Sequence, residues 1–168
     1  MEEHTYARTF LFMARSRLVV HLTGQIRACL DALNDQQIWW RPNEQSNAIG
    51  NLVLHCIGST RYYIGHVVGG TNFVRNRDAE FAERQPLSID ELRARLDAAL
   101  AEADQVLQAF DPAALLEPTA RTPTPSTHMQ VIGLQVAHYA AHTGQIAYAT
   151  KLIKGDAIDD IWRKTPTH

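Results

Sequence analysis

Cysteine is scarce in this 168-residue chain, which contains only Cys29 and Cys56. Both cysteines lie inside apolar helical patterns and not in the short spacings of a disulfide framework. A small fold held together by disulfides is therefore excluded. We expect two buried thiols in a protein of the reducing cytoplasm.

The chain also lacks an excess of positive charge. Lys and Arg together number 16, Asp and Glu together number 18, and the formal net charge is -2. Sequence-independent binding to nucleic acid depends on many cationic contacts with phosphates. The charge balance therefore argues against nucleic acid as a partner.

Long apolar runs are absent as well. No apolar stretch reaches the roughly 18 residues of a transmembrane helix, and the first residues, Met-Glu-Glu-His, do not resemble a signal peptide. We expect no membrane partner and a cytoplasmic location. Because roughly 100–200 residues per domain is usual, we also expect one domain over residues 1–168, with a bundle over about 5–154 and a tail over 155–168.

What the chain does contain is helical periodicity. Apolar residues recur at helical spacing in four long segments: about Thr5 to Leu33, Ala48 to Val68, Ile89 to Phe110 and His128 to Lys154. We expect Ser46 or Asn47 to cap the second helix, and Ser88 with Glu91 to form a capping box at the third. No segment shows a convincing strand alternation, so the sequence predicts an all-α four-helix bundle.

The segments between the helices are polar or rich in turn-forming residues. We expect Gly69-Gly70 to end the second helix, a polar connection from Thr71 to Leu87, and a loop from Thr119 to Thr127. In the tail, Ile158, Ile161 and Trp162 could dock against the bundle or against a second subunit.

His138 and His142 are four residues apart in the fourth predicted helix. Residues at this spacing share a face with Cβ atoms about 5–6 Å apart, so both imidazoles can reach one ion. Four apolar residues share this face by their spacing: Val131, Leu134, Ala149 and Leu152. We therefore expect the face to point into the bundle.

His55 is the best candidate for a third ligand. It lies in the middle of the nearly all-apolar second helix, where a polar ring needs a partner to offset its desolvation. Three protein ligands plus water is the usual arrangement of catalytic zinc. We hypothesise that His55, His138 and His142 hold one divalent ion, although the pair can arise by chance and buried histidines often only bond a backbone carbonyl.

Several other side chains have two open interpretations. Gln145, three residues after His142 on the same face, could hold a metal ligand or water in place, or form a helix-packing hydrogen bond. Arg75, Arg77 and Glu80 could form a structural ion-pair network or guide an anionic thiol cofactor. Others could line the pocket or approach it, or simply pack or face solvent: Tyr62, Tyr63, His66 and His21.

Four runs of the sequence together resemble one family. They are Trp39-Trp40-Arg41-Pro42, the run from Ser46 to His55, the run from Arg75 to Phe81, and His138-Tyr-Ala-Ala-His142-Thr-Gly-Gln145-Ile146. Their order and spacing are similar to those of the DinB-like (YfiT-like) superfamily, and the third run resembles its DUF1572 branch. The resemblance covers about Phe10 to Lys154. Gly58-Ser59-Thr60 stands where that branch usually has Gly-Asn, so Ser59 is expected to alter the pocket wall.

The resemblance implies a four-helix bundle, often dimeric, in which His55, His138 and His142 occupy the positions that bind nickel, zinc or a similar ion. Characterised relatives are thiol-dependent enzymes, among them S-transferases that use bacillithiol or glutathione and a mycothiol-dependent isomerase. We therefore expect a divalent-metal protein, for which a low-molecular-weight thiol is the candidate co-substrate. No residue is assigned a catalytic role.

Two other functions remain open. One is a non-catalytic dimer, stapled by metal, that binds a small molecule or acts in a stress response. The other is a metal-free helical dimer with core histidines. Structural metal sites normally fill all four positions and catalytic sites keep one open, so a fourth protein ligand would favour the non-catalytic function.

Overall fold

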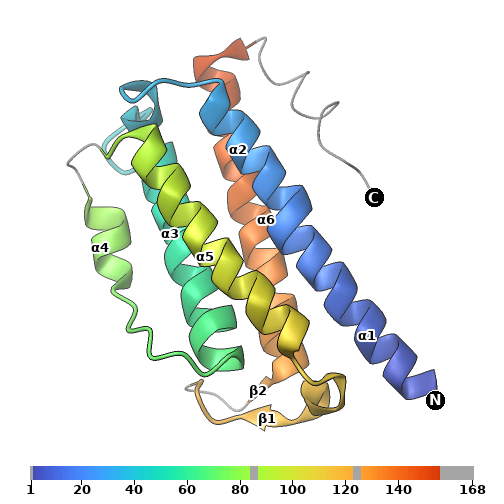
Figure 1. The fold of residues 1–168 in the computed structure, drawn as a ribbon. Coiled ribbons are helices and arrows are strands. Elements are labelled where there is room, and N and C mark those ends of the chain that lie inside the picture. Colours follow the sequence, from blue (N-terminus) through green and yellow to red (C-terminus); the bar gives the residue numbers. More distant parts are fainter. Residues whose placement is uncertain (1, 84–86, 123–125, 156–168) are drawn as a thin grey trace.

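A computed structural model of the chain describes residues 2–83, 87–122 and 126–155. Four long helical segments pack side by side as a bundle (Figure 1). The first is continuous and comprises α1 (Glu2–Arg15), a π-helical stretch (Ser16–Leu22) and α2 (Thr23–Asp31). The others are α3 (Ile49–Thr60) with its π-helical continuation (Arg61–Val68), α5 (Ile89–Ala109) and α6 (His128–Ile153). The prediction of an all-α bundle is confirmed.

Short elements connect the long ones. They are a 3-10 turn at Gln37–Trp39, the helix α4 at Arg77–Ala82, a second 3-10 turn at Pro112–Leu116, and the strands β1 (Pro118–Thr119) and β2 (Ser126–Thr127). The two strands pair antiparallel and are the only strands in the described parts of the chain. The tail residues Ile158, Ile161 and Trp162 lie outside the described residues.

The helix ends follow the capping predictions in part. Ser88 accepts a hydrogen bond from the Glu91 N–H at 3.2 Å, as a capping box requires. The prediction for the second helix is wrong, because the residue before its first turn is Ala48 and not Ser46 or Asn47. The Asn51 side chain accepts from the Ala48 N–H instead, while the Ser46 hydroxyl donates to Asn43.

The core forms where the four segments meet. In α5 the periodic leucines are almost completely buried: Leu92, Leu96, Leu100 and Leu107. Burying one such side chain contributes roughly 1.5–3 kcal/mol relative to leaving it exposed. The segment α3 packs against both α5 and α6, so its face toward α6 lies in the interior.

The buried face of α6 is not the predicted apolar one. Leu134 and Leu152 are 56% and 55% exposed, and of the four predicted residues only Val131 is fully buried. The interior face carries the apolar residues Ile132, Ile146 and Ala147 and also four polar residues: Gln135, Tyr139, Thr143 and Thr150. Each of the four polar residues makes a hydrogen bond, such as Tyr139 Oη with Thr23 Oγ1 at 3.0 Å, and such partners remove most of the cost of burying polar groups. The two histidines of α6 therefore lie at the edge of its buried face.

The helix α4 interrupts the predicted polar connection and lies against α3 (Figure 1). Asn76 caps it by accepting a hydrogen bond from the Ala79 N–H. Asn51 of α3 donates from Nδ2 to the backbone oxygens of Glu80 at 3.1 Å and Glu83 at 3.2 Å. These bonds satisfy the exposed carbonyls of a short helix and fix its position on α3.

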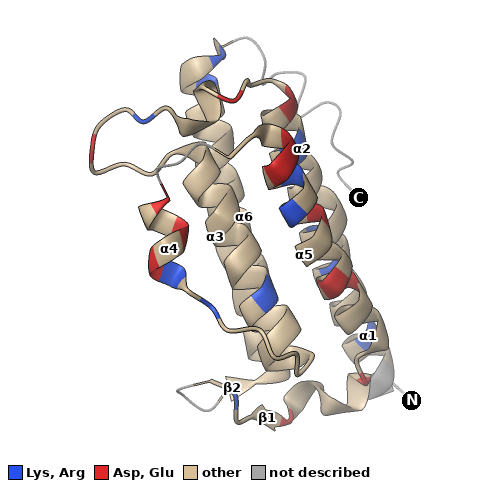
Figure 2. Cartoon of the chain, turned by 60° about the vertical axis from the view of Figure 1, so that its left-hand side comes forward, with Lys and Arg blue, Asp and Glu red and all other residues tan. Residues whose placement is uncertain are grey.

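Charged residues are distributed unevenly among the helices (Figure 2). The sequence of α3 from Ile49 to Thr60 contains no Asp, Glu, Lys or Arg, and neither does α6 from His128 to Thr150. Charged residues are densest on α4 and α5 (Figure 2). A carboxylate that contacts the inner side of α3 must therefore come from another element.

Glu102 of α5 contacts the π-helical continuation of α3 (Arg61–Val68). Its Oε2 lies 3.3 Å from Arg61 Nε, and Thr71 Oγ1 donates to its Oε1 at 3.4 Å. It lies against Gly65, where a Cβ atom would be only 2.2 Å from Glu102 Oε1.

Among the described residues, no helix is both long and apolar enough to cross a membrane.

Candidate metal centre

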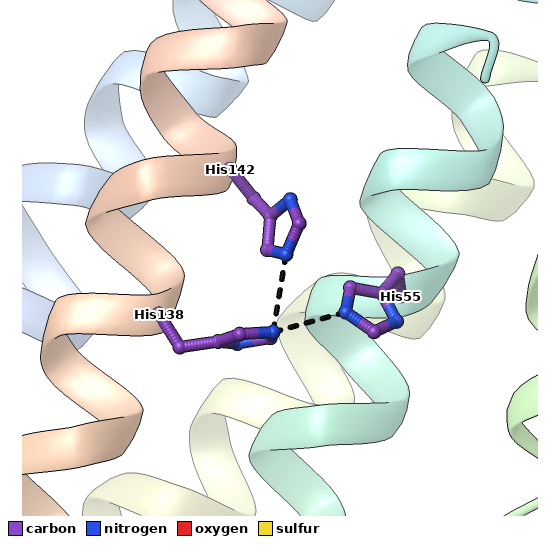
Figure 3. Close-up of side chains that lie close together, drawn as sticks. All are labelled: His55, His138 and His142. Atoms are coloured by element: carbon purple, nitrogen blue, oxygen red, sulfur yellow. Dashed lines mark hydrogen bonds between the residues drawn. The ribbon is translucent and has the colours of Figure 1, made fainter. Parts of the chain in front are cut away.

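Three histidine side chains from two helices meet between α3 and α6 (Figure 3). His55 comes from the middle of α3 and is 3% exposed, whereas His138 and His142 are half-buried and lie one turn apart on α6. His138 Nε2 is 3.0 Å from His55 Nε2 and 3.1 Å from His142 Nε2. The same ring nitrogen of each residue therefore faces a common point.

The spacing of these nitrogens fits one metal ion. With metal–nitrogen distances of about 2.0–2.1 Å, tetrahedral geometry places two ligand nitrogens about 3.3–3.4 Å apart. The separations of 3.0 and 3.1 Å from His138 Nε2 differ from this value by a few tenths of an ångström, and one ring nitrogen of each of the three residues lies within 4.8 Å of the others. Rotations of the rings can bring the three nitrogens to the tetrahedral spacing. Among the described residues, no fourth His, Cys, Asp or Glu joins the group.

Burial keeps the two histidines of α6 neutral. The pKa of His138 is lowered to about 4, mainly by burial and to a smaller extent by the charges of His142 and His55. Burial also lowers the pKa of His142, although the hydrogen bond to Gln145 opposes the change. A neutral imidazole keeps one nitrogen lone pair, which is the form that binds metal.

Hydrogen bonds at the opposite ring nitrogens determine which lone pair is free. His55 Nδ1 lies 2.8 Å from Glu80 Oε2, and His142 Nδ1 lies 2.8 Å from Gln145 Oε1. Both partners are oxygen acceptors, so each Nδ1 donates and each Nε2 keeps its lone pair. His138 Nδ1 is buried and makes no hydrogen bond with any described residue. Two lone pairs thus converge on His138 Nε2, an arrangement that a cation would satisfy.

Glu80 is itself firmly held. Arg75 Nε donates to its Oε1 at 2.7 Å and Arg75 Nη2 donates to its Oε2 at 2.8 Å. Burial alone would raise the pKa of Glu80, but the hydrogen bonds from Arg75 and His55 outweigh it and the pKa is lowered. Glu80 also lies against Gly58, where a Cβ atom would be 1.9 Å from its Oε1.

The other side chains singled out in the sequence have different contacts. Ser59 is buried and donates to the Cys56 oxygen at 3.1 Å, while Gln135 Nε2 lies 3.3 Å from the Ser59 hydroxyl. Tyr62 contacts the rings of Tyr63 and His66. Their roles as pocket residues, and that of Gln145 in holding a ligand, stay predictions.

The contact between Glu80 and His55 is not among the predictions. The sequence suggested only an ion-pair network or a cofactor guide at Arg75, Arg77 and Glu80. In the structure Arg75 pairs with Glu80, whereas the Arg77 guanidinium lies 5.0 Å from the centre of the Phe81 ring. A usable signal was Gly58, one turn after His55, because a glycine beside a buried histidine leaves room for a second group.

Comparison with known proteins agrees with the resemblance seen in the sequence. Residues 20–146 match the model of the DinB superfamily, a range that includes all three histidines and covers well over half of the chain. A search of curated proteins finds no match. The DUF1572 branch stays a prediction.

Proposed function

The chain belongs to the DinB superfamily, and from this premise we propose that His55, His138 and His142 bind one divalent metal ion through their Nε2 atoms. The convergence of these three atoms, with separations of 3.0 and 3.1 Å, carries the proposal. Imidazole ligands accept several first-row metals. Nickel, zinc and similar ions are therefore all candidates for the site.

We further propose that the site is catalytic. The absence of a fourth His, Cys, Asp or Glu from the group, among the described residues, supports this view because catalytic sites keep a position open. A divalent ion there supplies Lewis-acid chemistry, which favours the thiolate form of a thiol at neutral pH. The reaction class that we propose is thiol S-transfer.

In this reaction a low-molecular-weight thiol attacks a carbon electrophile that carries a leaving group. The sulfur–carbon bond forms with the electron pair of the sulfur, and the bond from carbon to the leaving group breaks with its pair. The thiol proton is taken up by the departing leaving group, which is released as its conjugate acid. The overall reaction is a substitution, so no oxidant or reductant is needed. Bacillithiol, mycothiol and glutathione are the candidate thiols.

The chain's own residues orient the rings around this site. Gln145 accepts the Nδ1–H of His142 and so keeps its Nε2 directed at the common point. Half-burial of His138 and His142 keeps both rings neutral while one side of the site stays near the surface.

The alternative is a non-catalytic protein in which the ion joins α3 to α6. Both functions use the same metal site, but only the enzyme turns over a substrate. In the non-catalytic protein the ion would stabilise the packing of α3 on α6, and its removal would lower stability without the loss of an activity.

We also propose that the protein forms a homodimer, as the resemblance implies. The support is the outer face of α6, where Leu134, Tyr148 and Leu152 are 56%, 67% and 55% exposed. This helix has no charged residue from His128 to Thr150, so two copies can meet along it without like-charge repulsion. Light scattering should give twice the chain mass of 18.8 kDa.

The deciding experiment is elemental analysis of tag-free protein. Wild type should contain about one ion per chain, and His138→Ala should contain none. His128→Ala is the matched control, because this histidine begins the same helix outside the group and should leave the metal content unchanged. Wild type without metal after reconstitution, or His138→Ala with full metal content, would reject the proposal.

The second measurement separates catalysis from a structural role. Metal-loaded wild type is assayed with each of the three thiols and a generic alkylating electrophile. Turnover that disappears in His138→Ala but persists in His128→Ala supports S-transfer. Full metal content without turnover with any thiol supports the non-catalytic function.

A further inference from the structure

We propose that Glu80 is a positioning residue for the metal site, which fixes His55 in the form that can bind a metal ion. The inference rests on the proposed metal-binding function and extends the site to α4. It assigns a role to the Arg75–Glu80 pair, which lies in the connection between α3 and α5.

The first argument is the choice of tautomer. A neutral imidazole carries one N–H and one lone pair, and either nitrogen can hold the proton. The Glu80 carboxylate accepts from His55 Nδ1 at 2.8 Å, so the proton lies on Nδ1. The lone pair then lies on Nε2, the atom that faces His138.

The second argument is the presence of a competing donor. Arg75 Nη2 lies 3.0 Å from His55 Nδ1. Without an acceptor at this point, the guanidinium would donate to Nδ1, and the imidazole proton would move to Nε2 and block metal binding. Because Glu80 Oε2 accepts from both groups at 2.8 Å, it draws both donors to itself.

The third argument is that the packing of α3 holds Glu80 in place. Asn51, His55 and Gly58 are spaced by four and three residues and so share one face of α3. Asn51 binds the backbone of α4, Gly58 leaves space for the Glu80 carboxylate, and His55 receives it. The Phe81 ring also packs against His55, with centroids 4.6 Å apart.

The fourth argument is the difference among the three rings. The His142 partner is the amide of the exposed Gln145, and His138 Nδ1 has no hydrogen-bond partner among the described residues. Of these three described rings, only His55 has an ionised acceptor at Nδ1, and that acceptor is 9% exposed. A carboxylate in this position raises the basicity of the ligand, and removing such a partner typically costs 10–100-fold in metal affinity.

The test measures the dissociation constant of Zn²⁺ by competition with a chelator. Glu80→Gln keeps the shape of the side chain but places an amide N–H among two other donors. We expect its affinity to fall by about 10–100-fold, with one ion per chain still bound at saturation. Glu102→Gln is the matched control. The Glu102 carboxylate also pairs with an arginine and lies against a glycine, but none of the contacts described above joins it to the three histidines. We expect its affinity to equal that of wild type.

A second readout is the tautomer of His55 in metal-free wild type, from long-range ¹H–¹⁵N NMR spectra. The proposal requires the proton on Nδ1 in wild type and a shift toward Nε2–H in Glu80→Gln. A purely structural role for Glu80 would not change the tautomer. The wild-type spectrum decides the matter even if Glu80→Gln does not fold.

The outcomes separate the two proposals. If wild type and Glu102→Gln bind no Zn²⁺, the proposed function fails. If wild type binds through its histidines but Glu80→Gln binds equally tightly, or the wild-type proton lies on Nε2, only the role of Glu80 is overturned.

Discussion

Two carboxylates contact the same helical segment in similar ways. Glu80 lies against Gly58, and Glu102 lies against Gly65, seven residues further along the chain. In both places a Cβ atom on the glycine would be within 2.2 Å of a carboxylate oxygen. We call these contacts the Glu80 contact and the Glu102 contact.

The two contacts differ in burial and in what the carboxylate reaches. Arg75 and Glu80 are 12% and 9% exposed, whereas Arg61 and Glu102 are 42% and 26% exposed. Glu80 also hydrogen-bonds to His55, a candidate metal ligand, whereas Glu102 accepts a hydrogen bond from the Thr71 hydroxyl. The same type of arginine–glutamate pair thus serves helix packing at the Glu102 contact and, we propose, a metal site at the Glu80 contact. The burial of each pair determines how much it contributes to the stability of the fold.

The largest difference is expected when each carboxylate is removed. Glu80→Ala leaves Arg75 buried without its partner, so it should lower the free energy of unfolding by about 3–5 kcal/mol. Glu102→Ala leaves Arg61 free to turn to solvent and should cost about 0–1 kcal/mol. Urea denaturation of metal-free protein measures both values. Equal losses would show that the burial of the two pairs has no energetic consequence.

Metal removal should also distinguish the two regions. An ion at 100 times its dissociation constant stabilises the folded protein by about 2.7 kcal/mol. After chelation we expect faster hydrogen exchange in α4 and in the turns of α3 and α6 that carry the histidines. Exchange around Gly65 and Glu102 should stay unchanged. Mass spectrometry of the peptides measures this, and uniform deprotection would contradict a local coupling between the metal and α4.

The glycines provide a smaller test. Gly58→Ala must displace a carboxylate held by Arg75 and His55, so we expect a loss of about 2 kcal/mol in the free energy of unfolding. In Gly65→Ala the partly exposed Glu102 can move to solvent, and the higher helix propensity of alanine, about 1 kcal/mol, offsets the contact. Thermal unfolding of both variants checks the difference. A neutral Gly58→Ala would mean that Glu80 is held loosely.

The long helices were predictable because each buries a face over many turns. The leucines of α5 repeat at helical spacing over 21 residues, and Ser88 and Glu91 mark its start. Helix α4 has only six residues and too few apolar positions to show a period. Its place depends on Asn51 and Gly58, which are distant in sequence, so it could not be read from its own residues.

The three histidines of the candidate site could be predicted from the sequence, but their surroundings could not. His138 and His142 share a face by spacing alone, and His55 was identifiable as a polar ring in an apolar helix. The interior side of α6 was predicted wrongly because Gln135 and Tyr139 are buried through hydrogen bonds to distant hydroxyls, which hydropathy does not reveal. The Glu80 contact was missed for the same reason, since it depends on tertiary packing.

The smallest expected effect is a difference in salt dependence. The coupling energy of each ion pair can be measured with a double-mutant cycle, using Arg61→Gln with Glu102→Gln and Arg75→Gln with Glu80→Gln. For the exposed pair we expect less than about 1 kcal/mol at low salt and about zero in 1 M NaCl, where the Debye length is about 3 Å. For the buried pair ions have no access to the space between the side chains, so the coupling should persist. A buried coupling that fell with salt as the exposed one does would place the Arg75–Glu80 pair effectively in solvent, and its role in orienting His55 would lose its physical basis.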